Sequence, residues 1–218
     1  LDQDVDLEKA LPPIVAASFA NGGQVCIRIQ RLFVHRARWD ETLTRFVEAA
    51  RAVPWGDPLD PRTVVGPLIE PRHVERVLAW VREAVDQGAT LHCGGEARGQ
   101  IVLPTVLTNV PRDARVCREE IFGPVTVLEP FDTFDEALAR CNETRFGLQA
   151  AVFTRDLGRA LRAFRELEYG GVIVNDAPTF RIDNFPYGGT KDSGFGREGV
   201  RYAMEELTEP RVLVLRGM

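Results

Sequence analysis

The sequence predicts an α/β fold in three layers, with a mostly parallel β-sheet and helices on both of its faces. Short apolar segments typical of strands alternate along the chain with amphipathic segments typical of helices. Strands separated by helices of this length pair in parallel through crossovers. Hydrophobic residues make up 44% and charged residues 27% of the 218 residues, a composition that excludes disordered, coiled-coil and collagen-like chains.

The first predicted element is a helix over residues 7–19, where apolar residues recur at helical spacing. Asp4 and Asp6 are good N-cap residues just ahead of it, and Asn21-Gly22-Gly23 ends it. The pair Pro12-Pro13 predicts a bend or a new start inside this helix, because proline removes a backbone donor.

The elements that follow are predicted from the same periodicities. Gly88 ends one helix at its C′ position, and Asp132 or Thr133 caps another. Further helices are expected over residues 39–53, 73–87, 133–141, 157–167 and 197–207. Strands are expected over residues 29–35, 91–93, 101–107, 125–128, 148–153, 172–174 and 212–215, with surface loops over 54–71 and 176–196.

Charge and motif content argue against several classes of function. The formal net charge of −5 disfavours a general nucleic-acid binder, and no apolar run has the ~20 residues that span a membrane. The four cysteines form no CxxC pair and the three histidines are scattered, so we expect no metal site. Reduced thiols and the lack of a secretory pattern favour a cytoplasmic location.

Cys26 is the first candidate for chemistry. It lies in the segment Phe19-Ala-Asn-Gly-Gly-Gln-Val-Cys26-Ile, between a predicted helix and a predicted strand. The glycines leave backbone amides free and let a substrate approach, but a cysteine is a nucleophile only as the thiolate. Residue type alone favours a structural cysteine here, and that interpretation is kept for Cys93, Cys117 and Cys141.

A pair of carboxylates followed by an aromatic residue is the second candidate. The run is Arg118-Glu119-Glu120-Ile-Phe122-Gly-Pro124, and its Gly-Pro end predicts a tight turn into a strand. A carboxylate can accept hydrogen bonds from both hydroxyls of a ribose, and an aromatic residue can flank a flat ring. Taken alone, the pattern favours a charged loop anchored by one phenylalanine.

The third candidate is the glycine-rich run Pro186-Tyr-Gly-Gly-Thr-Lys-Asp-Ser-Gly194-Phe-Gly196-Arg-Glu-Gly199. It contains GxGxxG, but a loop precedes the match and no second strand with an acidic residue follows it, so it is not a dinucleotide fingerprint. The simpler interpretation is a loop that packs its backbone closely and then enters a helix. A serine hydrolase is disfavoured because neither Ser18 nor Ser193 lies in a GxSxG motif.

Together, the three segments resemble the aldehyde dehydrogenase superfamily. The matching runs are Phe19-x-x-x-Gly23-Gln24-x-Cys26, Glu119-Glu120-Ile121-Phe122-Gly123-Pro124, then Asn175 and Pro186-Tyr-Gly-Gly-x-Lys191-x-Ser-Gly194-x-Gly196-Arg-Glu. Asp57-Pro-x-x-Pro-x-Thr-x-x-Gly66-Pro and Ile101-Val-Leu-Pro104-Thr105 agree as well. The order and spacing match over essentially the whole chain.

The resemblance implies oxidation of a small aldehyde to an acid with NAD or NADP. Cys26 then resembles the nucleophile, passing through a thiohemiacetal and a thioester, with its own backbone amide helping to hold the oxyanion. Glu120 resembles the residue that holds the nicotinamide ribose, and Phe122 the aromatic residue beside the nicotinamide. The substrate pocket of the family is expected at Val25, Ile27, Phe180 and Tyr187.

The resemblance also implies what the chain would lack. The main coenzyme fold, the oxyanion asparagine and the general-base glutamate of the family belong to an amino-terminal half, so we expect a fragment that is inactive alone. Residues 1–208 are expected to form the catalytic domain and residues 209–218 a terminal strand of the kind used to form a homo-oligomer. Arg28 and Arg181 would favour an anionic aldehyde, unless they are simply exposed and unpaired. The alternatives are a free-standing thiol hydrolase and a noncatalytic assembly domain.

Overall fold

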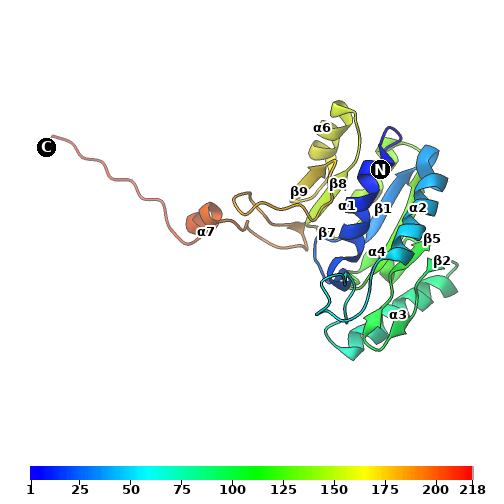
Figure 1. Ribbon diagram of the computed structural model, residues 1–218. Helices are drawn as coiled ribbons and strands as arrows, with labels where there is room; N and C mark the ends of the chain where they lie inside the picture. Colours follow the sequence, from blue (N-terminus) through cyan, green and yellow to red (C-terminus); the bar gives the residue numbers. More distant parts are fainter. Residues whose placement is uncertain (218) are drawn as a thin grey trace.

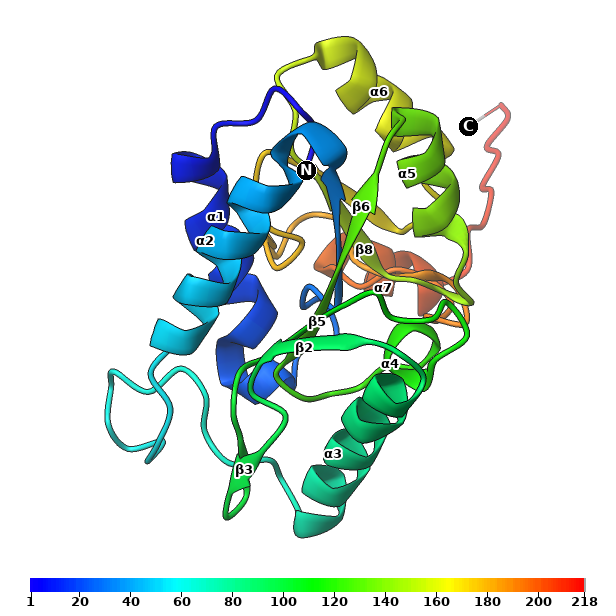
Figure 2. The same ribbon diagram turned by 90° about the vertical axis from the view of Figure 1, so that its right-hand side faces the viewer.

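The central layer of the fold is a β-sheet with helices against both faces (Figures 1 and 2). The computed structural model describes residues 1–217, so Met218 lies outside the described residues. The order in the larger sheet is β1-β6-β5-β2, in which β1 and β5 both run parallel to β6 while β2 is antiparallel to β5. A second sheet pairs β8 with β9 in parallel. These strands span β1 (Arg31–His35), β2 (Thr90–Cys93), β5 (Thr105–Thr108), β6 (Val125–Phe131), β8 (Gln149–Val152) and β9 (Gly171–Val174).

Alternation along the strands explains why helices cover both faces. Val34 of β1 packs into the cluster formed with helices α1 (Leu7–Phe19) and α2 (Trp39–Ala52). Phe33, the preceding residue, points to the opposite face and packs on Ala137 of α5 (Phe134–Asn142). Further along that second face, Val127 of β6 packs in the cluster that includes α3 (Pro71–Asp86). The predicted three-layer α/β fold is therefore confirmed.

Most helix boundaries follow the predicted caps. The carboxylate of Asp6 accepts from the backbone N–H of Glu8 at the start of α1, and the hydroxyl of Thr133 accepts from Glu136 at the start of α5. Gly88 follows α3 with a φ of +106°, a conformation that favours glycine. The helix does not restart at Pro12-Pro13, because α1 continues through both prolines as one helix.

Several other boundaries differ from the predictions by one to three residues, and two differences have a clear local reason. The strand expected over residues 101–107 is split into β4 (Ile101–Val102) and β5, since Pro104 lacks the N–H that a ladder needs. The last helix, α7 (Val200–Glu206), begins later than expected because Gly199 has a φ of +119°. The remaining elements are the helices α4 (Arg115–Arg118) and α6 (Leu157–Glu166), the 3-10 turns η1 (Ala20–Gly23) and η2 (Arg36–Arg38), and the strands β3 (Ala97–Arg98), β7 (Phe146–Gly147) and β10 (Thr190–Lys191).

The carboxyl-terminal residues extend away from the body of the protein (Figure 1). Residues 208–217 form no strand with any other described residue, so the predicted strand over 212–215 is not part of this chain's own sheets. Its side chains are open to solvent, with Val212 90% and Leu215 64% exposed. Its pairing with another subunit stays a prediction.

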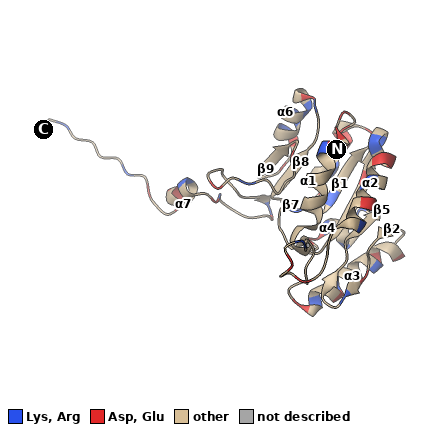
Figure 3. Ribbon diagram, in the orientation of Figure 1, with Lys and Arg blue, Asp and Glu red and all other residues tan. Residues whose placement is uncertain are grey.

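The surface charge is mixed in sign. Lys and Arg lie beside Asp and Glu along the outer helices (Figure 3). None of the helices formed by the described residues combines the length and the apolar character that crossing a lipid bilayer requires.

Candidate active site

Cys26 lies in a turn between η1 and β1, at the mouth of a cavity of about 220 Å3. Its side chain is exposed. The chain reaches this turn through Gly22 and Gly23, whose φ values of +63° and +74° lie in the left-handed region that favours glycine. The glycines ahead of the cysteine are therefore required by the backbone path that presents its thiol.

Gly23 also brings the first motif against the second. A Cβ atom at Gly23 would lie 2.1 Å from the carbonyl oxygen of Gly123, far closer than any real contact. The backbone that leads to Cys26 therefore packs directly on the turn that follows Glu120 and Phe122. This close approach unites two segments about a hundred residues apart in the sequence.

Gln30 holds the second motif in place and was not identified from the sequence. Its amide Nε2 donates to the backbone oxygens of Val116 at 2.9 Å and Glu119 at 2.6 Å. Its Oε1 accepts from the backbone N–H of Ile121 at 3.1 Å. One side chain thus satisfies the backbone on both sides of Glu120, and nothing in a lone glutamine before a strand signals that role.

Glu120 and Phe122 border the same cavity as Cys26. Phe122 has a φ of +42°, a strained backbone for a bulky residue, and the residue is 40% exposed. Partial burial raises the pKa of the Glu120 carboxyl, and the negative charge of Glu119 raises it further. The nearby positive charge of Arg145 acts in the opposite direction but does not cancel the rise. The second motif therefore presents a carboxylate and an aromatic face together.

The third motif is joined to the other two by polar contacts. Arg145 bonds Glu119 at 2.6 Å and Asp192 at 3.1 Å, linking the second motif to the third. The hydroxyl of Tyr187 lies 3.4 Å from the Sγ atom of Cys26, linking the third motif to the first. Burial raises the pKa of Tyr187 above its usual range, and the contact with Cys26 adds to this.

The expected substrate-pocket residues occupy different places. Val25 lines the cavity beside Cys26, and Tyr187 contacts the thiol itself. Ile27 and Phe180 are not among the residues that line the cavity. Phe180 lies 43% exposed in the loop that carries the third motif.

The two arginines considered for anion binding also differ. Arg28 is not an exposed, unpaired side chain. It donates to the backbone oxygens of Ser18 and Val125, and its Nη1 is buried without a partner among the described residues. Burial lowers the pKa of its guanidinium to about 9, so it stays charged at neutral pH. Arg181 is exposed at the site: its guanidinium stacks 4.4 Å from the ring centre of Tyr187 and bonds Glu198 at 3.2 Å.

The other three cysteines occupy environments that suppress the thiolate. Burial raises the pKa of Cys117 to about 12, and burial also raises the pKa of Cys93 and Cys141. Cys26 is the exposed member of the four. In the part of the chain that the structure describes, no three His, Cys, Asp or Glu side chains are placed to hold a metal ion.

Comparison with known proteins gives matches along almost the whole chain. A sequence profile described as the aldehyde dehydrogenase family matches residues 1–213. The 3-sulfolactaldehyde dehydrogenase of Priestia aryabhattai is 47% identical over 98% of this chain and 45% of its own length. Aspartate-semialdehyde dehydrogenase 1 of Pseudomonas canavaninivorans is 44% identical over 97% of this chain and 45% of its own.

Solved structures agree with these matches. Aldehyde dehydrogenase 21 from Physcomitrella patens, in complex with the reaction product succinate, superposes with a TM-score of 0.94 at 44% identity, covering 97% of this chain and 44% of that one. The NADP complex of glyceraldehyde-3-phosphate dehydrogenase from Methanocaldococcus jannaschii gives 0.89 at 42% identity, over 93% and 44%. The chain thus spans under half the length of the relatives it matches.

Proposed function

Because this chain belongs to the aldehyde dehydrogenase family, we propose that it supplies the nucleophile and part of the coenzyme site of an NAD- or NADP-dependent aldehyde dehydrogenase. The observation that carries the proposal is the shared cavity. Cys26, Glu120 and Phe122 come from two distant segments, and all three border one space. A thiol alone would fit many reactions, but a thiol facing a carboxylate and an aromatic ring fits an oxidation that needs a nucleotide.

Cys26 performs the covalent part of the proposed reaction. Its thiolate attacks the carbonyl carbon of the aldehyde and forms a thiohemiacetal, whose oxyanion the backbone amide of Cys26 helps to hold. Loss of hydride leaves a thioester on the sulfur, and water then releases the acid and restores the thiol. The Tyr187 hydroxyl, 3.4 Å from the sulfur, keeps its proton at neutral pH because its pKa is raised, so it can donate to the thiolate.

Glu120 and Phe122 fit the nicotinamide end of the coenzyme. A carboxylate offers two oxygens to the paired hydroxyls of a ribose, and the exposed face of Phe122 offers a flat apolar surface to a ring. The bound coenzyme supplies the hydride acceptor. Gln30, through its three bonds to the backbone around Glu120, keeps this carboxylate at the cavity.

We further propose that the aldehyde carries an acid group at its far end. The guanidinium of Arg181 stacks on the ring of Tyr187, and the hydroxyl of Tyr187 contacts the Sγ atom of Cys26. A positive charge therefore lies next to a side chain that contacts the reacting sulfur. The relatives named above act on 3-sulfolactaldehyde and aspartate semialdehyde, and the moss structure holds succinate. Each of these molecules bears an anionic group, which a guanidinium recognises well.

The proposal is tested in the enzyme that contains this chain, by formation of reduced nicotinamide from semialdehydes. Cys26→Ser is expected to abolish the reaction, because a hydroxyl stays protonated at neutral pH. Arg181→Gln is expected to raise KM for an acidic aldehyde about tenfold or more and to leave an uncharged aldehyde unaffected. Arg98→Gln, at an exposed arginine paired with Glu96 far from Cys26 in sequence, is the matched control. Full activity in Cys26→Ser would contradict the nucleophile, and equal KM effects on both aldehydes would contradict the acidic substrate.

The extended carboxyl-terminal arm supports a role in assembly. Residues 209–217 leave the body of the protein (Figure 1). Their apolar side chains are exposed, as in a strand whose partner lies on another subunit. We propose a homo-oligomer joined through this arm, with removal of residues 209–218 expected to reduce the mass seen by light scattering. The four free thiols favour a reducing, cytoplasm-like compartment.

A further inference from the structure

Arg145 connects the second motif to the third without reaching the cavity itself. Its Nη2 donates to the Glu119 carboxylate at 2.6 Å, and its Nη1 donates to the Asp192 carboxylate at 3.1 Å. Glu119 borders the cavity, whereas Arg145 and Asp192 are not among the residues that line it. Any effect of this arginine on a bound molecule therefore passes through the acidic side chains near it.

The position of Arg145 is set by strand pairing with the third motif. Arg145 immediately precedes β7, which pairs with β10 in antiparallel orientation. The backbone N–H of Asp192 donates to the Arg145 oxygen at 2.9 Å, and the Ser193 hydroxyl accepts from the N–H of Gly147 at 2.9 Å. The guanidinium lies 4.3 Å from the ring centre of Phe146, a cation–π contact. The guanidinium therefore extends from a fixed backbone and lies against an aromatic face.

Lys191 holds the other strand of this pair. Its Nζ donates to the backbone oxygens of Asn142 at 3.0 Å and Thr144 at 3.2 Å, and it pairs with the carboxylate of Glu168 at 2.7 Å. Thr144 is the residue directly ahead of Arg145. The third motif and the segment that carries Arg145 are thus bonded into one unit, which the Arg145 side chain joins to the second motif.

The second motif presents two adjacent carboxylates, and Arg145 binds one of them. Gln30 holds the backbone on both sides of Glu120, so the path of the chain here is fixed without the arginine. The Glu119 carboxylate is bound by Arg145, whereas the Glu120 side chain forms no hydrogen bond or ion pair with any residue that the structure describes. The arginine therefore determines which of two neighbouring carboxylates remains free.

The charges of Arg145 and Glu119 act on Glu120 in opposite directions. Partial burial and the negative charge of Glu119 raise the pKa of the Glu120 carboxyl, and the positive charge of Arg145 lowers it. Asp192 faces the same arginine from the third motif. Without the charge of Arg145, both remaining effects raise the pKa, so a larger share of Glu120 is protonated at a given pH. A protonated carboxyl offers fewer acceptor sites to a pair of ribose hydroxyls.

We propose that Arg145 is a positioning residue for Glu120, which binds Glu119 and Asp192 and so keeps Glu120 a free, charged carboxylate for the coenzyme. This role rests on the coenzyme function proposed above for Glu120. Both ion pairs of Arg145 are exposed, and exposed pairs contribute little to stability. The effect of losing Arg145 is therefore expected in coenzyme binding rather than in folding.

The test measures KM for the coenzyme and for the aldehyde in the enzyme that contains this chain, from about pH 5 to pH 8. Arg145→Gln is expected to raise KM for the coenzyme about threefold at neutral pH and to leave KM for the aldehyde unchanged. The acid side of the pH profile of kcat/KM for the coenzyme should move to higher pH. Arg145→Lys keeps the positive charge, so its profile should stay close to that of the parent. A shift in Arg145→Lys as large as in Arg145→Gln would contradict the proposal.

Arg162 of α6 offers a matched control. Like Arg145, it is exposed and bonds two carboxylates, those of Asp135 at 2.5 Å and Glu166 at 2.6 Å, and it lies near a phenylalanine ring. Arg162 and its two acidic partners are not among the residues that line the cavity. Arg162→Gln is therefore expected to leave KM for the coenzyme unchanged at every pH.

Glu120→Gln separates the role of Arg145 from the coenzyme role of Glu120. A glutamine does not titrate, so Arg145→Gln added to Glu120→Gln should no longer move the pH profile. A parent-like coenzyme KM in Glu120→Gln overturns the coenzyme role and, with it, the role of Arg145. A raised KM in Glu120→Gln with a parent-like KM in Arg145→Gln overturns the role of Arg145 alone.

Two further results would also overturn the role of Arg145. One is the same shift in Arg162→Gln, and the other is an equal rise of both KM values in Arg145→Gln. Either result would show a general effect of lost surface charge on the protein, not an effect on Glu120.

Discussion

Alkylation of the four cysteines tests the assignment of Cys26 most directly. The perturbation is iodoacetamide at pH 8, applied to the unmodified chain and to Cys26→Ser. Burial raises the pKa of Cys117 from 9.0 to about 12, so at that pH it holds about a thousandfold less thiolate than an ordinary thiol. Because the thiolate is the reacting species, its labelling slows in proportion.

The expected order of labelling follows from exposure and burial. Cys26, exposed at the cavity mouth, reacts first; Cys93 and Cys141, whose pKa values are raised by burial, follow; and Cys117 reacts last. Peptide mapping by mass spectrometry at successive times measures each rate. Raising the pH should speed Cys117 about tenfold per pH unit, up to its pKa. Equal rates at all four thiols, or a fast phase that survives in Cys26→Ser, would refute the reasoning.

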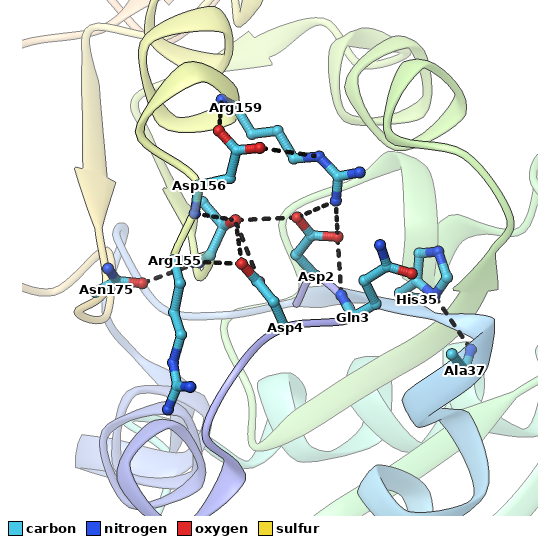
Figure 4. Close-up of polar contacts among 10 residues, drawn as sticks. Asp2, Gln3, Asp4, His35, Ala37, Arg155, Asp156, Arg159 and Asn175 are labelled. Carbon is cyan, nitrogen blue, oxygen red and sulfur yellow. Dashed lines mark hydrogen bonds and ion pairs between the residues drawn. The ribbon is translucent and has the colours of Figure 1, made fainter.

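Three further predictions concern the framework of the site. Gly23→Ala should destabilise the fold well beyond the control Gly99→Ala. Both positions have a left-handed φ, which costs an alanine about 1–2 kcal/mol, but only the Cβ atom at position 23 would strike backbone, at 2.1 Å. Thermal melts of the two variants measure the difference. Asp2→Asn should cost about 1–3 kcal/mol at neutral pH. Burial raises the pKa of Asp2, but the hydrogen bonds that its carboxylate accepts from Arg159, Gln3 and Thr154 (Figure 4) outweigh burial, so the pKa is lowered overall. The stabilisation of the fold by the Asp2 carboxylate is therefore complete above its unfolded pKa of ~3.9 and is lost as the pH falls through its folded pKa. Equal stability of the variant and the parent at pH 7 would contradict this. Glu120→Gln should slow single-turnover formation of reduced nicotinamide in the complete enzyme while Cys26 labelling stays unchanged, because an amide loses the charge-assisted bonds to a ribose; a parent-like rate would remove the coenzyme role.

Local patterns in the sequence were sufficient for the order of the longer helices and of the strands β1, β2, β5, β6, β8 and β9, but not for α4, β3, β7 or β10. The Asp6 cap, the apolar face of α3 and the alternation in β1 each depend on residues within a few positions of one another. Such patterns determine helix, strand and turn before any distant contact forms. Gly22 and Gly23, just ahead of Cys26, are also a local pattern. Their left-handed backbone is the conformation that a close approach of the chain at this point needs.

Tertiary structure alone decided what surrounds the reactive residues. Gln30 bonds backbone 86 and 89 residues away, and the Tyr187 hydroxyl reaches Cys26 across 161 residues, so neither contact leaves a local pattern. The sequence left open whether Arg28 binds an anion or is exposed and unpaired, yet packing buried it against α1 and β6. Side-chain type and spacing specify which groups are present, whereas their distances, burial and pKa values depend on which distant backbone packs beside them.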